Sequence, residues 1–293
     1  MRFGILGDSD DIYLHISHTY TLTHTLPAKM STSPSHPHKT IAFFGASTGV
    51  GLAALKRALA AGHTCIALCR TPSKLLDKLP AADREHPNLK VVQGDAHDLA
   101  AVTRCCLQAH AQDGEGSEGG GKGKKPVDVI LSSIGGVFQF PRMTLDDPHV
   151  CERGMATLLE AVTSVRQQQQ QEQEGEGEGE WTPRIVVVST CGMARHRDYP
   201  LATFPMYKFL LRVPHADKIK MERALVAGAG YTYTIVRPSL LVDAAAPQRE
   251  IRVGVDDEPA VGYTISRDDV GGWIYESVLD KGGFGNRIVT VTW

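Results

Sequence analysis

The chain has 293 residues, of which 42% are hydrophobic and 22% are charged, a composition typical of globular proteins. The formal net charge of −2 gives no broad attraction to nucleic acid or to an anionic membrane surface. No apolar run reaches the roughly 18 to 20 residues that a membrane-spanning helix requires, so neither nucleic acid nor a membrane is expected as a partner.

The N-terminal segment 1–38 differs in composition from the rest of the chain and is predicted to be a disordered extension. It is rich in His, Ser, Thr and Pro and lacks the apolar core of a secretory signal. His15, His18 and His24 are framed by no Cys or carboxylate at ligand spacing, so no metal site is expected. Met30 opens a polar lead that runs directly into the first strand, and our hypothesis is that the native chain starts there.

From residue 40 onward, apolar and helical segments alternate. The short apolar runs, rich in β-branched residues, predict buried strands at 40–44, 64–69, 89–93, 127–131, 184–189 and 233–238. The segments between them predict helices at about 50–61, 73–79, 98–110, 148–166 and 214–229. This alternation indicates an α/β protein with a doubly wound parallel sheet of the Rossmann type, which we assign to residues 39–293. Further strands are expected at 250–255 and 286–293, with a helix at 267–280 between them.

Two low-complexity inserts interrupt the pattern, the Gly-rich segment 112–125 and the Gln and Glu-Gly segment 167–180. Neither has enough apolar surface to offset the entropy of ordering, so both are predicted to be flexible. Each follows a helix and precedes a strand, which puts it at the amino edge of a parallel sheet. Ligands bind at the carboxyl edge, so we expect both inserts to be remote from the site, with docking of a protein partner as the alternative.

The strongest local signal is a glycine-rich loop between the first strand and the first helix. Glycines allow a tight turn and a close approach of backbone N–H groups to a pyrophosphate, and the helix N-terminus adds its dipole. The sequence therefore predicts a dinucleotide site. Its candidate residues in this loop are Gly45, Ser47, Thr48, Gly49, Val50 and Gly51.

The strands that follow predict the rest of the cofactor site. NAD-selective sites place an acid after the second strand, whereas this chain has Arg70, whose guanidinium can bind a 2′-phosphate bidentately. NADP(H) is therefore expected over NAD(H), and a solvated surface arginine is the alternative. Asp95, just past the third strand, is the candidate contact for the adenine amino group, and Asp98 is predicted to cap the next helix. The small-residue turn at 132–136, including Ser132, Ser133 and Gly135, would let the second half of the cofactor lie close to the backbone.

The six cysteines form no CxxC pair, and most lie in apolar stretches. Buried free thiols of this kind are typical of a reducing compartment, so a cytoplasmic location is expected.

Taken together, the glycine loop, Arg70, Asp95, the turn 132–136, "YTIVRPSLLVD" and "ISRDDVG" resemble the short-chain dehydrogenase/reductase superfamily. The likeness covers about residues 40–280 and is closest to the atypical NmrA-like and NAD(P)H-binding members. The resemblance implies that NAD(P)H is bound in an extended form and that Pro238 passes beside the nicotinamide. It also implies that the region of about 238–293 shapes a substrate pocket.

The resemblance further implies a catalytic Ser, Tyr and Lys. Ser189 follows the fifth strand, where the family has its serine, and Lys218 matches the family lysine; for Lys218 an ordinary helix pair with Glu222 is the alternative. The family tyrosine would stand at Pro214, which instead predicts the start of a helix. Tyr207, Tyr199 and His215 are the candidates that could donate the proton in place of the family tyrosine. Of these, we assign the role to Tyr207.

The sequence therefore predicts an NADP(H)-dependent oxidoreductase that reduces a carbonyl or a conjugated double bond of a small organic molecule. The alternative is a non-catalytic NADP(H)-binding regulator of the NmrA type, which the missing tyrosine favours and which would act on a protein partner. A third interpretation is that the protein is an epimerase or a dehydratase.

Overall fold

The computed structural model describes residues 37–108, 125–139, 144–172, 180–243 and 249–293. Residues 1–36 of the predicted extension lie outside the described residues, together with the three histidines weighed above as metal ligands. Of the first predicted insert, only Lys125 is described.

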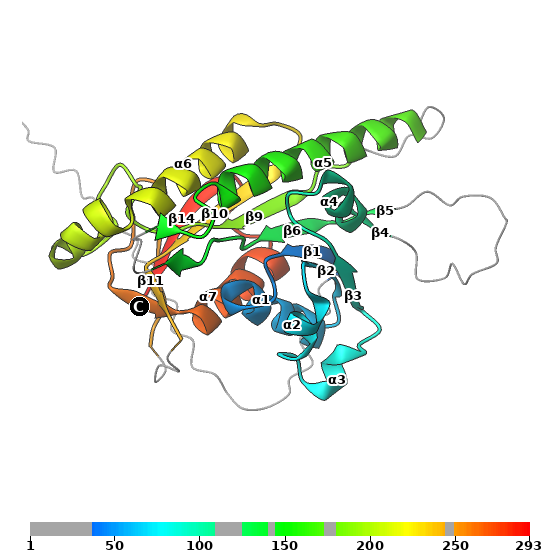
Figure 1. Ribbon diagram of the computed structural model, residues 1–293, viewed down its shortest axis with the longest axis horizontal. Helices are drawn as coiled ribbons and strands as arrows, with labels where there is room; N and C mark the ends of the chain where they lie inside the picture. Colours follow the sequence, from blue (N-terminus) through cyan, green and yellow to red (C-terminus); the bar gives the residue numbers. More distant parts are fainter. Residues whose placement is uncertain (1–36, 109–124, 140–143, 173–179, 244–248) are drawn as a thin grey trace, which may run out of the picture. The chain divides into compact units, whose positions relative to one another are not determined.

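Within the described residues, eight strands form one sheet in the order β12-β14-β10-β9-β6-β1-β2-β3 (Figure 1). In chain order these are β1 (Thr40–Phe44), β2 (Thr64–Cys69), β3 (Leu89–Gln93), β6 (Val129–Ser132), β9 (Arg184–Val188), β10 (Thr232–Pro238), β12 (Arg252–Val255) and β14 (Arg287–Thr292). All neighbouring strands are parallel except β12 and β14. The chain leaves β1 toward β2 and β3, then returns to β6 on its other side. This reversal confirms the predicted doubly wound sheet and marks the edge where such folds bind ligands.

Helices cover both faces of the sheet. One face carries α1 (Gly49–Ala60), α2 (Pro72–Leu76), α7 (Arg267–Trp273) and the π-helical η4 (Ile274–Asp280). The other face carries α4 (Leu99–Cys106), α5 (Val150–Glu172) and α6 (Arg212–Ala227), and Figure 1 shows α5 and α6 side by side over it. A short helix, α3 (Ala81–Arg84), lies between α2 and β3 in the chain.

The remaining strands form three small two-stranded sheets. They are β4 (Leu107–Gln108) with β5 (Lys125–Pro126), β7 (Phe138–Gln139) with β8 (Thr144–Leu145), and β11 (Leu240–Val242) with β13 (Thr264–Ser266). The β11–β13 pair is parallel and joins the two C-terminal motifs noted in the sequence.

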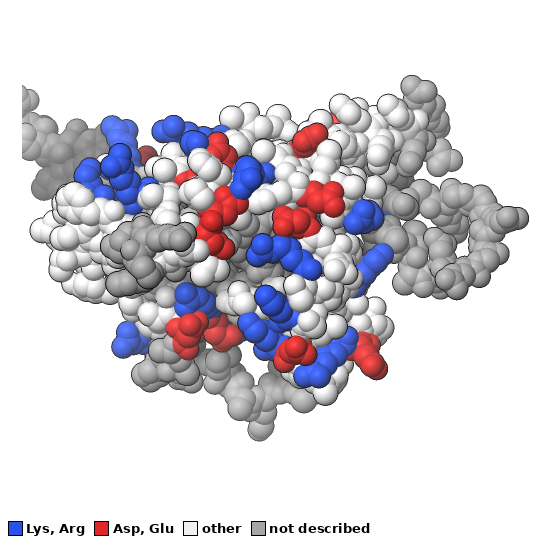
Figure 2. Space-filling view, in the orientation of Figure 1, with Lys and Arg blue, Asp and Glu red and all other residues white. Residues whose placement is uncertain are grey.

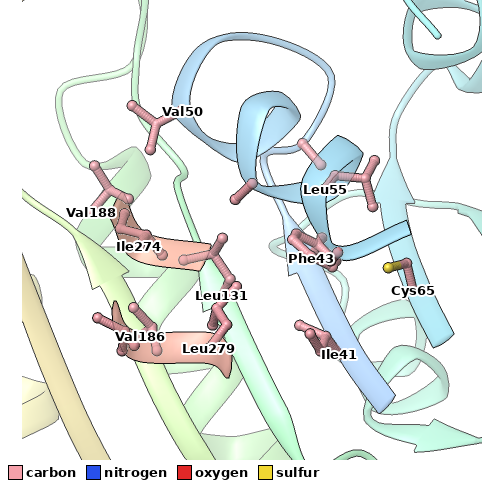
Figure 3. Packing of buried hydrophobic residues seen from close by; sticks show 14 of the residues in the cluster. Ile41, Phe43, Val50, Leu55, Cys65, Leu131, Val186, Val188, Ile274 and Leu279 are labelled. Atoms are coloured by element: carbon pink, nitrogen blue, oxygen red, sulfur yellow. The ribbon is translucent and has the colours of Figure 1, made fainter. Parts of the chain in front are cut away.

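The core is divided by the alternation of side chains along the strands. On β1, Ile41 and Phe43 point to the α1 face, whereas Ala42 and Phe44 point to the α5 face. Figure 3 shows Ile41 and Phe43 beneath α1, close to Leu55. Burial of a large apolar side chain such as Ile41 or Phe43 contributes about 1.5–3 kcal/mol, and β1 is buried at every position and apolar after Thr40.

The element boundaries differ from the prediction at α5. The first three predicted strands match the observed bounds, but α5 continues to Glu172 instead of ending at residue 166. Residues 167–172 were predicted to be a flexible insert and are helical. Gln and Glu are good helix formers, and extending an existing helix costs little until a glycine intervenes. Residues 173–179 lie outside the described part of the chain.

Two aspartates fix the starts of the α4 and α5 helices. Asp98 accepts hydrogen bonds from the N–H groups of Ala100 and Ala101 and caps α4, as predicted. Asp217, on α6, accepts from the N–H groups of Cys151 and Glu152 at 2.9 and 2.8 Å. It therefore caps α5 from a neighbouring helix and holds the two helices in register.

No helix in the described ranges combines the length and the hydropathy that a bilayer span requires. Lys and Arg are interspersed with Asp and Glu over the face drawn in Figure 2, in keeping with a net charge close to zero.

The contact of α7 with α1 depends on Gly271. A Cβ at this position would lie 2.5 Å from Ala53 Cβ and 2.7 Å from Val50 O. We predict that Gly271→Ala lowers the free energy of unfolding by about 1–3 kcal/mol because the helices cannot separate without losing core contacts. Urea unfolding would measure this. The control is Gly154→Ala in α5, where the Cβ would lie 3.3 Å from the tip of Ile134 and at ordinary contact distance from the His97 ring. A loss as large in the control would show that α7 packing is not the cause.

Candidate functional site

The glycine loop between β1 and α1 lies against the turn that follows β6. Gly45 has φ +86°, and a Cβ there would lie 2.8 Å from the backbone carbonyl of Ser133. A Cβ on Gly51 would lie 2.3 Å from Ser133 Oγ. That hydroxyl donates to Gly45 O at 3.0 Å, so Ser133 fastens the loop to the neighbouring strand end. No larger residue fits at Gly45 or Gly51 in this arrangement.

The start of α1 is suited to an anion. Thr48 at the N-cap makes no side-chain hydrogen bond to the first turn, and Gly49 adopts φ +59°. Within the described residues, no side chain caps the N–H groups of this turn, which leaves them and the helix dipole for a phosphate. Ser47 donates weakly to Cys69 Sγ at 3.5 Å, which ties the loop to the end of β2. Val50 is buried against the core.

Arg70 and Asp95 follow the carboxyl ends of β2 and β3. Arg70 is exposed, with its guanidinium available to solvent. Asp95 Oδ1 accepts from the N–H of His97 at 2.9 Å and lies 3.5 Å from His97 Nδ1. Both residues therefore stand at the same edge as the glycine loop, although Asp95 is already engaged by His97.

Lys218 reaches this edge from α6. Its ammonium donates to Ile134 O at 3.0 Å and to Val188 O at 2.8 Å, carbonyl groups at the ends of β6 and β9. An ammonium has three N–H donors, so one remains for another acceptor. The open turn lies beside it: Ser132 is buried, and a Cβ on Gly135 would meet no atom within 4 Å.

Ser189 belongs to a buried polar network. Its hydroxyl donates to Glu222 Oε1 at 2.5 Å, and the residue is only 5% exposed. Glu222 also binds Arg237 through two hydrogen bonds of 3.0 and 2.5 Å. A buried charge is stable only when it is paired, so this network holds α6 against β9 and β10. Glu222 consequently pairs with Arg237, whereas Lys218 is bound by backbone carbonyls.

An aromatic stack lies beyond the end of β9. Tyr207 stacks on Tyr199, with ring centroids 4.5 Å apart, and on His215 at 5.9 Å. A Cβ on Gly192 would lie 2.4 Å from the Tyr207 ring and 2.7 Å from the His215 ring, so a glycine is required where the loop crosses the stack. The Tyr207 hydroxyl makes no hydrogen bond within the described part of the chain, and burial raises the pKa of Tyr207. The three predicted substitutes for the family tyrosine are thus brought together.

The start of α6 lies two residues earlier than predicted. The helix begins at Arg212, and Pro214 is the third residue of its first turn, where a missing N–H leaves no bond unmade. Tyr207 lies on a separate π-helical segment, η3 (Met206–Leu210), which Leu211 separates from α6. Pro214 therefore supplies no hydroxyl, and Tyr207 approaches from another segment.

Other polar groups of this region were not predicted from the sequence. Asp198 is buried and accepts from the N–H of Gly192 at 2.8 Å, and burial raises the pKa of its carboxyl group. Among the described residues, the second carboxylate oxygen of Asp198 and the Nε2 of His215 find no hydrogen-bond partner. Pro238 ends β10 in the core and accepts from the N–H of Cys191 at 3.0 Å. All six cysteines are free and buried, as expected.

Comparisons with known proteins agree with this geometry. The model of the NAD(P)H-binding family matches residues 178–281, the part that carries Lys218 and the C-terminal strands. The chain is 38% identical over 277 residues to the reductase pytE of Aspergillus terreus, a match that covers 87% of this chain and 98% of pytE. It is 33% identical over 268 residues to the oxidase pynE of Aspergillus niger, covering 83% and 94% of the two chains.

A solved structure shows the same fold. The short-chain dehydrogenase/reductase of Veillonella parvula in complex with NADP superimposes with a TM-score of 0.60 at 12% identity, covering 87% of this chain and 95% of that one. Fold and site together define a Rossmann-type oxidoreductase that binds a nicotinamide dinucleotide. The chain belongs to a family of NAD(P)H-binding reductases that includes pytE.

The burial of His215 predicts a pH dependence. Burial lowers the pKa of His215 from its ordinary 6.5, opposed by the charge of Glu222. Below pH 6.5 the unfolded chain therefore binds a proton that the folded chain does not, and stability falls as the pH falls. We predict that His215→Phe makes this decline shallower in urea unfolding above and below pH 6.5. His196→Phe, which removes an exposed ring, should keep the wild-type slope; equal slopes in all three proteins would contradict the prediction.

Proposed function

We propose that this protein is an NADP(H)-dependent oxidoreductase that reduces a carbonyl or a conjugated double bond of a small organic molecule. The observation that carries the proposal is the cradle at the carboxyl edge. Gly45 and Gly51 pack so closely on the β6 turn that no side chain fits, while the uncapped first turn of α1 offers N–H groups to a phosphate. These features fit a dinucleotide with its diphosphate at the start of α1.

The preference for NADP(H) rests on Arg70. An exposed guanidinium after β2 occupies the position where an acid would bind the ribose hydroxyls of NAD. A guanidinium and a phosphate form two parallel charge-assisted hydrogen bonds, which a ribose hydroxyl cannot reproduce. Asp95, one strand further along, is assigned to the adenine side of the cofactor.

Lys218 and the β6 turn are assigned to the nicotinamide half. With two N–H donors on Ile134 O and Val188 O, the Lys218 ammonium has one donor left for a ribose hydroxyl. Ser132 and Gly135 border the space beside the Lys218 ammonium. Pro238 lies at the end of β10, the strand next to β9. When bound, the reduced nicotinamide supplies the hydride, and the protein supplies orientation.

Tyr207 is assigned as the proton donor. The Tyr207 hydroxyl is protonated at neutral pH, and although burial raises its pKa and makes it a weaker acid, the oxygen of a carbonyl substrate becomes basic enough to take the proton as the hydride arrives. Ser189 acts indirectly in this scheme: its hydroxyl is used by Glu222, and its role is to hold α6 and therefore Lys218 in position.

The same observations support a second candidate, a non-catalytic NADP(H)-binding regulator. Pro214 stands where the family has its tyrosine. The Ser189 hydroxyl donates its hydrogen bond to Glu222, so it is not directed into an open pocket. A regulator would bind NADPH tightly and turn over no member of a panel of aldehydes, ketones, enones and quinones. An oxidoreductase oxidises NADPH with at least one of them, which the loss of NADPH absorbance would record.

Removing Arg70 tests the cofactor preference. Hydrogen bonds to charged groups contribute about 1.5–3 kcal/mol, which corresponds to roughly 10- to 150-fold in affinity. We predict that Arg70→Ala weakens NADPH binding by about this factor and leaves NADH binding unchanged, as measured by calorimetry. Arg104→Ala, an exposed arginine on α4, is the matched control and should bind both cofactors normally. An Arg70→Ala protein that still prefers NADPH would overturn the assignment.

Paired substitutions test the catalytic roles. We predict that Tyr207→Phe lowers kcat by about 100-fold or more with little change in the KM for NADPH, because it removes only the proton donor. Lys218→Met should raise the KM for NADPH as well as lower kcat. Tyr231→Phe and Lys220→Met are the controls; they remove a hydroxyl bonded to Leu225 O and an exposed ammonium bonded to Glu152. Full turnover in Tyr207→Phe would assign the proton to solvent.

A further inference from the structure

Each of two C-terminal motifs contains a charged residue without a role in the site described so far, Asp243 in "RPSLLVD" and Arg267 in "ISRDDVG". The structure brings their ends together. β11 and β13 pair in parallel, with Val242 opposite Ser266, so the next residues, Asp243 and Arg267, lie side by side. Arg267 Nη1 donates to Asp243 Oδ1 at 2.8 Å.

Arg267 lies over the glycine loop. A Cβ on Gly49 would be 3.1 Å from Arg267 Cδ and 3.7 Å from Arg267 Nε, so the arginine crosses the first residue of α1. The close packing of α7 on α1 through Gly271 fixes this approach. The Arg267 side chain is thereby held against the first residue of α1, whose uncapped turn is the part of the site assigned to a diphosphate.

A cavity of about 410 Å³ opens at this point between α1, β11 and α7. Gly49, Lys56, Asp243 and Arg267 contribute to its lining. The two other acids there are already engaged, since Asp268 pairs with Arg57 at 2.8 Å and Asp269 accepts from Trp293 Nε1 at 3.0 Å.

The Asp243–Arg267 pair is suited to exchange. The Asp243 side chain is 86% exposed and that of Arg267 is 36% exposed, and such ion pairs contribute little to stability. A diphosphate offers more negative charge and accepts a guanidinium bidentately. A diphosphate can therefore displace Asp243 from Arg267 at a small cost in free energy.

We propose that Arg267 binds the diphosphate of the dinucleotide from the α7 side, and that Asp243 holds the guanidinium until the cofactor displaces it. The inference rests on the proposed function and adds to it: the C-terminal motifs contribute a phosphate ligand, and Asp243 competes with the cofactor. The two side chains then have opposite effects on affinity, which a merely structural ion pair would not have.

Calorimetric binding of three probes tests the proposal. NADPH and 2′-phospho-ADP-ribose carry the diphosphate, whereas 2′-AMP does not. Arg267→Ala should weaken the first two by about tenfold or more and leave 2′-AMP unchanged. Asp243→Asn should tighten the first two, and should have no effect when Arg267 is already alanine. Arg287→Ala, which breaks an exposed pair with Asp256 at the opposite edge of the sheet, is the control and should bind all three normally.

The outcomes separate this inference from the proposed function. If the wild-type protein binds neither NADPH nor 2′-phospho-ADP-ribose, both are refuted. If wild-type binding is normal and Arg267→Ala does not change it, the inference alone is refuted. Weakening of the diphosphate probes by Asp243→Asn would also refute it, because that result identifies the pair as structural. Thermal unfolding of each variant without ligand records any loss of the fold itself.

Discussion

The arrangement of the site depends on one buried carboxylate. Glu222 of α6 accepts hydrogen bonds from Arg237 on β10 and from Ser189 after β9, and its charge would be unstable in the core without them. On the same helix, Asp217 caps α5 and Lys218 binds the carbonyl ends of β6 and β9. Three polar side chains within six positions thus fix α6 to the strand ends. The position of the Lys218 ammonium follows from these contacts more than from apolar packing.

This arrangement is compatible with a proline in the first turn of α6. The helix can begin with Pro214 in its first turn because its orientation is set further along by Glu222. Ser189, which stands where the family has a catalytic serine, contributes to the same network. Tyr207 lies on η3 and stacks on His215, which belongs to the first turn of α6 itself.

Much of the fold could be predicted because it is local. Apolar runs with β-branched residues identified the sheet strands, and the glycine loop identified the ligand edge before any contact was known. The site was less accessible to prediction, because its partners are far apart in sequence. Asp217 caps a helix 65 residues away in the chain, and Glu222 binds Arg237 on β10, whereas Lys218 was identified from its match to the family lysine. The extension of α5 through the glutamine run was missed because low complexity was equated with flexibility.

The length of α5 has a practical consequence. The helix has 23 residues, but its last fully buried side chain is Val165, so its final two turns stand clear of the core (Figure 1). They lie toward the amino edge of the sheet, opposite the glycine loop. Each residue gained or lost beyond Gln170, which donates to Glu180 at 2.9 Å, changes the helix length by about 1.5 Å without reaching the apolar core. Natural variation in repeat length is therefore compatible with an unchanged site, and this overhang is a suitable attachment point for a fluorophore or an affinity handle.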